Sequence, residues 1–109
     1  MKDFLYDKDY QKFTLNNNIS QFSKDEVTVV IPVLNEEESI GQVLKKFKKE
    51  GYNNILVIDG YSTDNTVQIA SINGANIIYQ HGIGKTGAIK TAIEHIKTTY
   101  FLIMAGDCT

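Results

Sequence analysis

The chain has 109 residues, of which 42% are hydrophobic and 22% charged, a composition that predicts one ordinary globular domain and excludes a disordered or fibrous protein. Its net charge of −2 gives no field to attract a nucleic-acid backbone, and no apolar run reaches the ~20 residues that span a bilayer. With Cys108 as the only cysteine, which excludes an internal disulfide, these features predict a cytoplasmic protein with no nucleic-acid partner and no transmembrane segment in this chain.

Residues 1–26 lack a clean hydrophobic period, and we expect an N-terminal extension with one short helix there. From residue 27 onward, apolar runs alternate with segments of helical period. The expected strands are 27–33, 54–59, 75–79 and 100–104, and the expected helices are 37–50, 62–72 and 85–97. This alternation predicts one α/β domain over 27–109, with a parallel sheet and helices on both faces. Ligands of such sheets bind outside the carboxyl ends of the strands, so the loops there are the candidate sites.

The first two of these loops carry polar residues. Asn35 can cap the following helix and Glu36 lies near its positive end, or either can face a ligand over the edge of the sheet. Asp59 ends the second strand, where its carboxylate can accept hydrogen bonds from a ribose or a base, and its burial would require a partner. Ser62 and Asp64 are interpreted as residues that start the next helix.

The third loop, 80–87, contains Gly84-Lys85-Thr86, which matches the end of a Walker A motif. The match fails because Tyr79 stands where that motif requires its first glycine. Glycines, a helix N-terminus and a lysine still favour an anion such as phosphate. A glycine-rich turn with a solvated lysine and no ligand would have the same sequence pattern.

The last strand is followed by Asp107, whose carboxylate suits Mg²⁺ or Mn²⁺. One carboxylate does not define a metal site. Cys108 has no neighbouring base, which argues against a nucleophilic role.

Four segments together resemble the signature of family 2 glycosyltransferases, close to the dolichyl-phosphate mannosyl- and glucosyltransferase branch. They are VVIPVLNEEESI, ILVIDGYSTDNT, GIGKTGAIKTAI and FLIMAGD, in this order within residues 27–107. The resemblance implies a Rossmann-like A-type glycosyltransferase fold with a four-stranded parallel sheet in which the first strand, 27–33, is central. It also implies an inverting transfer of a hexose from a GDP- or UDP-sugar to an acceptor such as a polyprenyl phosphate. Such an acceptor would bring the protein to the cytoplasmic membrane surface.

The resemblance also assigns roles to single residues. The nucleotide-sugar-binding residues that it implies are Pro32, Asn35, Glu36, Asp59, Lys85 and Asp107. Asp107 corresponds to the second aspartate of the family's Asp-x-Asp motif, which binds the metal that bridges the diphosphate. Ala105 replaces the first aspartate and weakens the expected Mg²⁺ or Mn²⁺ site.

The acceptor-binding region and the catalytic base are implied to lie beyond Thr109, and this fragment alone is expected to be inactive. Two alternatives stay open at the level of the sequence. A non-catalytic nucleotide- or sugar-binding module is consistent with Ala105, and a P-loop-like phosphotransferase is suggested by Gly84-Lys85-Thr86.

Overall fold

The computed structural model describes residues 2–7, 12–15 and 23–105, which form one six-stranded sheet in the order β2-β1-β6-β3-β4-β5. The elements are β1 (Lys2–Asp7), β2 (Lys12–Leu15), η2 (Lys24–Glu26), β3 (Val27–Val33), α1 (Ile40–Lys49), β4 (Asn54–Asp59), α2 (Thr66–Ile72), β5 (Asn76–Tyr79), α3 (Gly84–His95) and β6 (Tyr100–Ala105). Strands β6, β3, β4 and β5 are parallel and β3 is central, as predicted. Within the described residues, no helix combines the length and the apolar character needed to cross a membrane.

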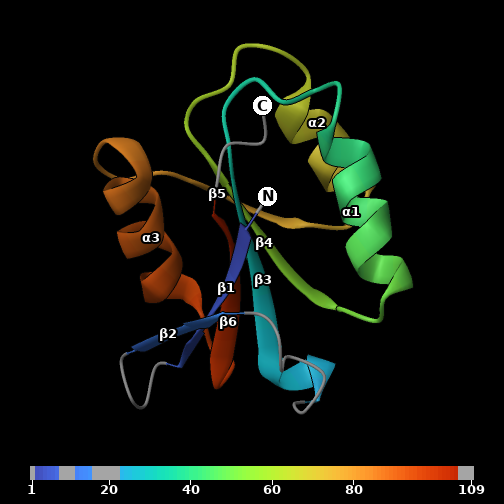
Figure 1. Cartoon of the computed structure of the whole chain (residues 1–109). Helices are drawn as coiled ribbons and strands as arrows, with labels where there is room; N and C mark the ends of the chain where they lie inside the picture. Colours follow the sequence, from blue (N-terminus) through green and yellow to red (C-terminus); the bar gives the residue numbers. More distant parts are fainter. Residues whose placement is uncertain (1, 8–11, 16–22, 106–109) are drawn as a thin grey trace.

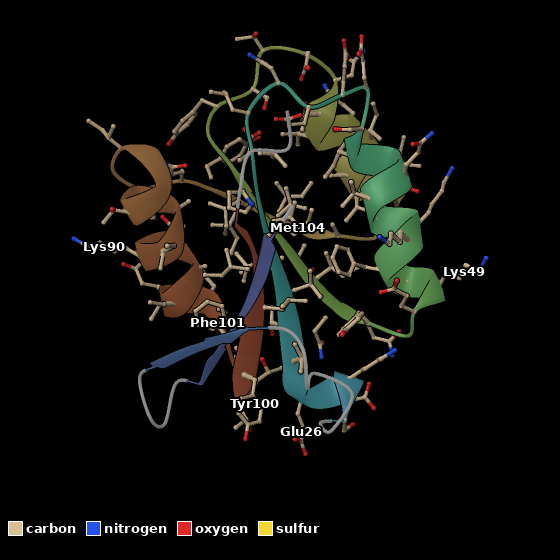
Figure 2. All side chains as sticks on the ribbon, viewed as in Figure 1. Glu26, Lys49, Lys90, Tyr100, Phe101 and Met104 are labelled. Atoms are coloured by element: carbon tan, nitrogen blue, oxygen red, sulfur yellow. The ribbon has the colours of Figure 1, made fainter. Side chains whose placement is uncertain are left out.

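The sheet separates two cores, because successive side chains of a strand point to opposite faces. One core lies under α1 and α2 and includes Val29, Ile31, Leu44, Val57, Ala70, Leu102 and Met104. The other lies under α3 and includes Val30, Leu56, Ile58, Ala88, Ala92, Phe101 and Ile103. Figure 1 shows α1 and α2 on one side of the sheet and α3 on the other, and Figure 2 shows Phe101 on the α3 side. The predicted helices on both faces are therefore confirmed.

The N-terminal segment forms a β-hairpin. Strand β1 pairs antiparallel with β6, from Lys2 opposite Ala105 to Asp7 opposite Tyr100, and β2 pairs antiparallel with β1. We expected an extension with one short helix in residues 1–26, and the described residues there form this hairpin and a short 3-10 helix, η2. The pairing gives hydrogen-bond partners to backbone groups on the outer edge of β6, which would otherwise form an open edge.

Two helices start later than their sequence patterns predict. Helix α1 begins at Ile40 instead of residue 37, and α2 begins at Thr66 instead of residue 62. The residues in between form turns whose polar groups bond to one another across the two loops. These turns lie at the carboxyl ends of β3 and β4, at the top of the view in Figure 1.

Candidate functional site

Three loops meet at Gly60, at the carboxyl ends of the parallel strands. The Gly60 amide donates to the carbonyl oxygen of Val33 at 2.9 Å, and the Gln80 amide donates to the carbonyl oxygen of Asp59 at 2.8 Å. A Cβ atom built on Gly60 would lie 3.6 Å from Oε1 of Gln80 and 3.8 Å from Cβ of Leu34. The loops after β3, β4 and β5 therefore form one continuous surface, as expected for a parallel sheet.

Ser62 joins the first two loops through the buried carboxyl group of Asp59. The Ser62 amide donates to Oδ2 of Asp59 at 2.9 Å and its hydroxyl donates to Oδ1 at 2.6 Å, while the Asn35 amide donates to Oγ of Ser62 at 2.8 Å. The side chain of Asn35 completes the connection, since its Oδ1 accepts from the Thr63 amide at 2.8 Å. Buried Asp59 therefore has the hydrogen-bond partner that the sequence led us to expect. Because 0% of its surface is exposed, its role here is to hold the turn after β4 in place.

A second set of hydrogen bonds joins the same loops nearer the helices. The Glu36 amide donates to Oγ1 of Thr66 at 2.8 Å, and the Asn65 amide donates to Oε2 of Glu37 at 3.0 Å. Asp64 accepts from the amide of Glu37 at 3.3 Å and from the amide of Thr66 at 2.9 Å. Neither residue therefore starts α2 as interpreted from the sequence: the helix begins at Thr66 after its N-cap Asn65, Asp64 accepts from the amide of Thr66 from outside the helix, and Ser62 bonds to Asp59.

The ionised form of Asp64 is favoured by these contacts. Desolvation raises the pKa of Asp64 and is the largest single influence, but the hydrogen bonds from the Thr66 hydroxyl and from the amides of Thr66 and Glu37 together outweigh it, so the pKa falls below its usual 3.8. A carboxyl group whose pKa is lower in the folded state stabilises the fold above the unfolded pKa. That stabilisation is lost as the pH falls from 3.8 through the folded-state pKa.

We expect Asp64→Asn to lower the free energy of unfolding at about pH 7 and to lower it less at about pH 2.5, because protonation of the wild-type carboxylate removes part of the same stabilisation once the pH is below 3.8. Urea unfolding followed by circular dichroism at the two pH values measures the difference. Asp25→Asn is the control, since Asp25 is exposed and far from this edge, in η2. An equal loss for Asp64→Asn at both pH values would contradict a role for its charge.

A shallow depression of about 270 Å³ lies beside these loops. The residues that line it are Asn35, Glu36, Glu37, Glu38, Ser39 and Asp64. Because four of them carry carboxyl groups, this depression disfavours phosphate groups and suits donors such as hydroxyls. Asn35 and Glu36, both predicted site residues, lie here, whereas Pro32 is half-buried within β3 opposite Ile58.

The loop between β5 and α3 and the first turn of α3 contain three glycines at positions that disfavour a side chain. Gly82 and Gly84 have φ values of 77° and 66°, and a Cβ atom on Gly87 would lie 2.6 Å from the carbonyl oxygen of His81. Nε2 of Gln80 donates to the carbonyl oxygen of Gly84 at 3.0 Å, which holds the loop against the start of α3. The N-terminus of this helix, free of carboxylates in its first turn, is the part of the edge that favours an anion.

Two predicted site residues have side chains outside the described part of the structure. Lys85 is the second residue of α3, and only its backbone is described. Asp107, the predicted metal ligand, lies beyond residue 105, and so does Cys108. Within the described residues, no group of three or more histidine, cysteine, aspartate or glutamate side chains could hold a metal ion.

The structure adds an aromatic pair that the sequence reading missed. The rings of Tyr61 and Tyr79 stack with centroids 5.5 Å apart and planes 20° apart. Tyr61 follows Gly60 in the loop after β4, and Tyr79 ends β5, so the pair lies on the same edge as the loops described above. The stacking depends on the backbone conformation of Tyr61, so no local sequence pattern predicts it.

Comparison with known proteins identifies relatives over most of this domain. A family model described as "Glycosyl transferase family 2" matches residues 28–109. Glycosyltransferase AglJ of Haloferax volcanii is 43% identical over 86 residues, covering 78% of this chain and 28% of AglJ. A dolichyl-phosphate hexose transferase of the same organism is 32% identical over 77 residues, covering 69% of this chain and 33% of that protein. The chain thus spans about a third or less of the length of these two relatives.

Solved structures support the same fold. Glucosyl-3-phosphoglycerate synthase from Mycobacterium tuberculosis, in complex with Mn²⁺, UDP-glucose and phosphoglyceric acid, superposes with a TM-score of 0.61 at 25% identity. The match covers 66% of this chain and 30% of the synthase. The predicted Rossmann-like A-type glycosyltransferase fold is confirmed.

Proposed function

The chain belongs to glycosyl transferase family 2, and on that premise we propose that it forms the nucleotide-sugar-binding part of a transferase that moves a hexose from a GDP- or UDP-sugar. One observation carries the proposal: three loops meet at Gly60 on the carboxyl edge of a parallel sheet, and they divide that edge into an acidic part and a part that favours anions. The synthase structure that contains UDP-glucose supports a nucleotide sugar as the ligand class.

The division of the edge suggests how the donor lies. The diphosphate belongs with the N-terminus of α3 and Lys85, because a positively polarised helix end and an ammonium group both favour an anion. The ribose hydroxyls belong near Asn35 and Glu36, where carboxylate and amide oxygens can accept hydrogen bonds. Asp59 contributes by holding the turn between these two regions, and Pro32 shapes the end of β3.

The reaction itself is proposed for the whole protein, by likeness to its longer relatives. Asp107 is the proposed ligand of Mg²⁺ or Mn²⁺, in line with the Mn²⁺ and Mg²⁺ in structures of the synthase. Such an ion would offset negative charge on the leaving diphosphate. An acceptor of the polyprenyl phosphate class is supported by the relative named dolichyl-phosphate hexose transferase, and we propose inverting displacement at the cytoplasmic membrane surface.

Calorimetric titration of the chain with GDP, UDP and ATP, each with Mn²⁺ and with a chelator, tests the proposal. We expect GDP or UDP to bind in preference to ATP, and Lys85→Ala to weaken that binding about tenfold, because a hydrogen bond to a charged group is lost. Lys90→Ala is the matched control, since Lys90 lies on the same helix and points outward from α3 (Figure 2). It should bind like the wild type.

The outcomes separate the alternatives. A folded chain that binds none of the three nucleotides contradicts the donor-site proposal, and a preference for ATP favours a phosphotransferase. Nucleotide binding by the whole protein without hexose transfer to any lipid phosphate would favour a non-catalytic binding module. Loss of binding with chelator would support the metal at Asp107.

A further inference from the structure

We propose that Tyr61 and Tyr79 form a platform on which the base of the donor nucleotide stacks. The inference rests on the proposed function and adds to it the residues that hold the base. The two rings are stacked on each other, yet 66% of Tyr61 and 50% of Tyr79 stay exposed to solvent. Aromatic side chains in this state offer ring surface to a third planar group, and stacking on a base is tolerant of which base it is.

The backbone of Tyr61 is the first reason to look for a role beyond folding. Its φ of 68° lies in the left-handed region, which is favourable for glycine, tolerated by asparagine and an outlier for a bulky side chain. Asn35, the other described non-glycine residue with positive φ, is of the tolerated kind. A tyrosine that adopts this conformation while mostly exposed gains little from burial, and such outliers concentrate at functional sites.

The turn that contains Tyr61 is held in place by hydrogen bonds between the residues on either side of it. Asp59 accepts two hydrogen bonds from Ser62, so the residues on both sides of Gly60-Tyr61 are anchored. Ser62 in turn accepts from the Asn35 amide, which ties the turn to the loop after β3. Since the carboxyl group of Asp59 is buried, Tyr61 is the group that this turn presents at the surface, and Asp59 acts as its positioning residue.

The place of the pair suits the base in particular. Tyr61 and Tyr79 follow β4 and β5, the last two strands in the order β6-β3-β4-β5, whereas Asp107 follows β6 in the sequence. Two strand spacings, roughly 10 Å, separate β6 from β4. The pair also lies next to the loop that leads from Tyr79 to the start of α3, so a nucleotide whose phosphates bind at that helix start can bring its base to these rings.

Three variants test the platform. Tyr61→Asn removes the ring but keeps a residue that tolerates positive φ, Tyr79→Leu removes the second ring, and Tyr61→Phe keeps the ring as the control. We expect Tyr61→Asn and Tyr79→Leu to weaken GDP and UDP by about 5- to 150-fold in calorimetric titration, and Tyr61→Phe to leave affinity close to wild type. Inorganic pyrophosphate, which has no base, should bind all four proteins equally.

Each result bears on a different claim. If the wild type binds neither GDP nor UDP, the platform falls together with the proposed function. If the wild type binds them and both ring-deleted variants bind equally well, only the platform is wrong. Loss of UDP-glucose affinity without loss of UDP affinity would assign the pair to the hexose instead of the base, and parallel loss of pyrophosphate binding would trace the effect to a damaged loop.

Discussion

Asp59→Ala is expected to lower the free energy of unfolding by about 3 kcal/mol, measured by urea unfolding at neutral pH. The carboxyl group is fully buried and accepts from both the amide and the hydroxyl of Ser62. Alanine leaves both donors without this acceptor and leaves space at the end of β4. Because the same turn presents Tyr61, nucleotide affinity should fall as well, even under conditions where the variant is folded.

Two controls make this result interpretable. Asp59→Asn keeps the volume and one acceptor oxygen, so its loss should be about half as large. Asp25→Ala removes an exposed carboxyl group that accepts from Nδ2 of Asn53 at 3.3 Å, and it should change stability by less than about 0.5 kcal/mol. A loss below about 1 kcal/mol for Asp59→Ala would mean that the turn repacks without the carboxyl group.

The strands were the most predictable part of the fold. The bounds of β3 and β4 agree with the sequence reading because both are continuous apolar runs, buried on both faces. Their alternation with helices was enough to predict parallel pairing, whereas the central place of β3 followed from the resemblance to a glycosyltransferase family. These features follow from local patterns, which a single sequence carries.

Features that depend on contacts between distant segments were not predictable. The hairpin β1–β2 joins the sheet because β1 pairs with β6, which is distant in the sequence, with Lys2 opposite Ala105. The late start of α2 depends on Asp64, which accepts from the amide of Glu37 in the preceding loop. Residue types alone do not specify which of several compatible partners a strand or a carboxylate will find.

The candidate site was predictable in position and less so in detail. The rule that ligands bind at the carboxyl ends of parallel strands pointed to the loops after β3, β4 and β5, which the structure brings together, and Asn35, Glu36 and Asp59 lie in them or at their start. The sequence could not show that Asp59 is fully buried or that Tyr61 and Tyr79 stack. Both depend on the backbone of one turn, whose conformation is set by Ser62.

If the proposed function holds, the division of charge along this edge would let a single chain segment hold a ligand with three chemically different parts. Phosphates, hydroxyls and a base make opposite demands on their surroundings, and one uniform pocket would favour one at the expense of the others. Here the anion-favouring helix start follows β5, the carboxylates of the depression come mainly from the loop after β3, and the aromatic pair joins the loop after β4 to the end of β5. The hydrogen bonds among those loops keep the three regions in register.

Gly87→Ala is expected to lower the free energy of unfolding by about 2 kcal/mol or more, because a methyl group does not fit at this position. A Cβ atom there would lie 2.6 Å from the carbonyl oxygen of His81 and 2.8 Å from the carbonyl carbon of Gly82. Those backbone atoms cannot easily withdraw, since the His81 amide donates to Oγ1 of the buried Thr91 at 2.8 Å. Urea unfolding measures the loss, and calorimetry should show weaker GDP and UDP binding at the displaced loop.

Gly84→Ala is the matched comparison within the same loop. Apart from its two neighbours in the chain and the backbone of its own helix, no described atom lies within 4 Å of a Cβ built on Gly84, so the cost comes mainly from the positive φ of 66° and should be about 1 kcal/mol. The expected order, with Gly87→Ala the more damaging, separates steric exclusion from backbone strain. If Gly87→Ala proves as mild as Gly84→Ala, the loop moves away from α3 readily, and a rigid anion site at this helix start is not supported.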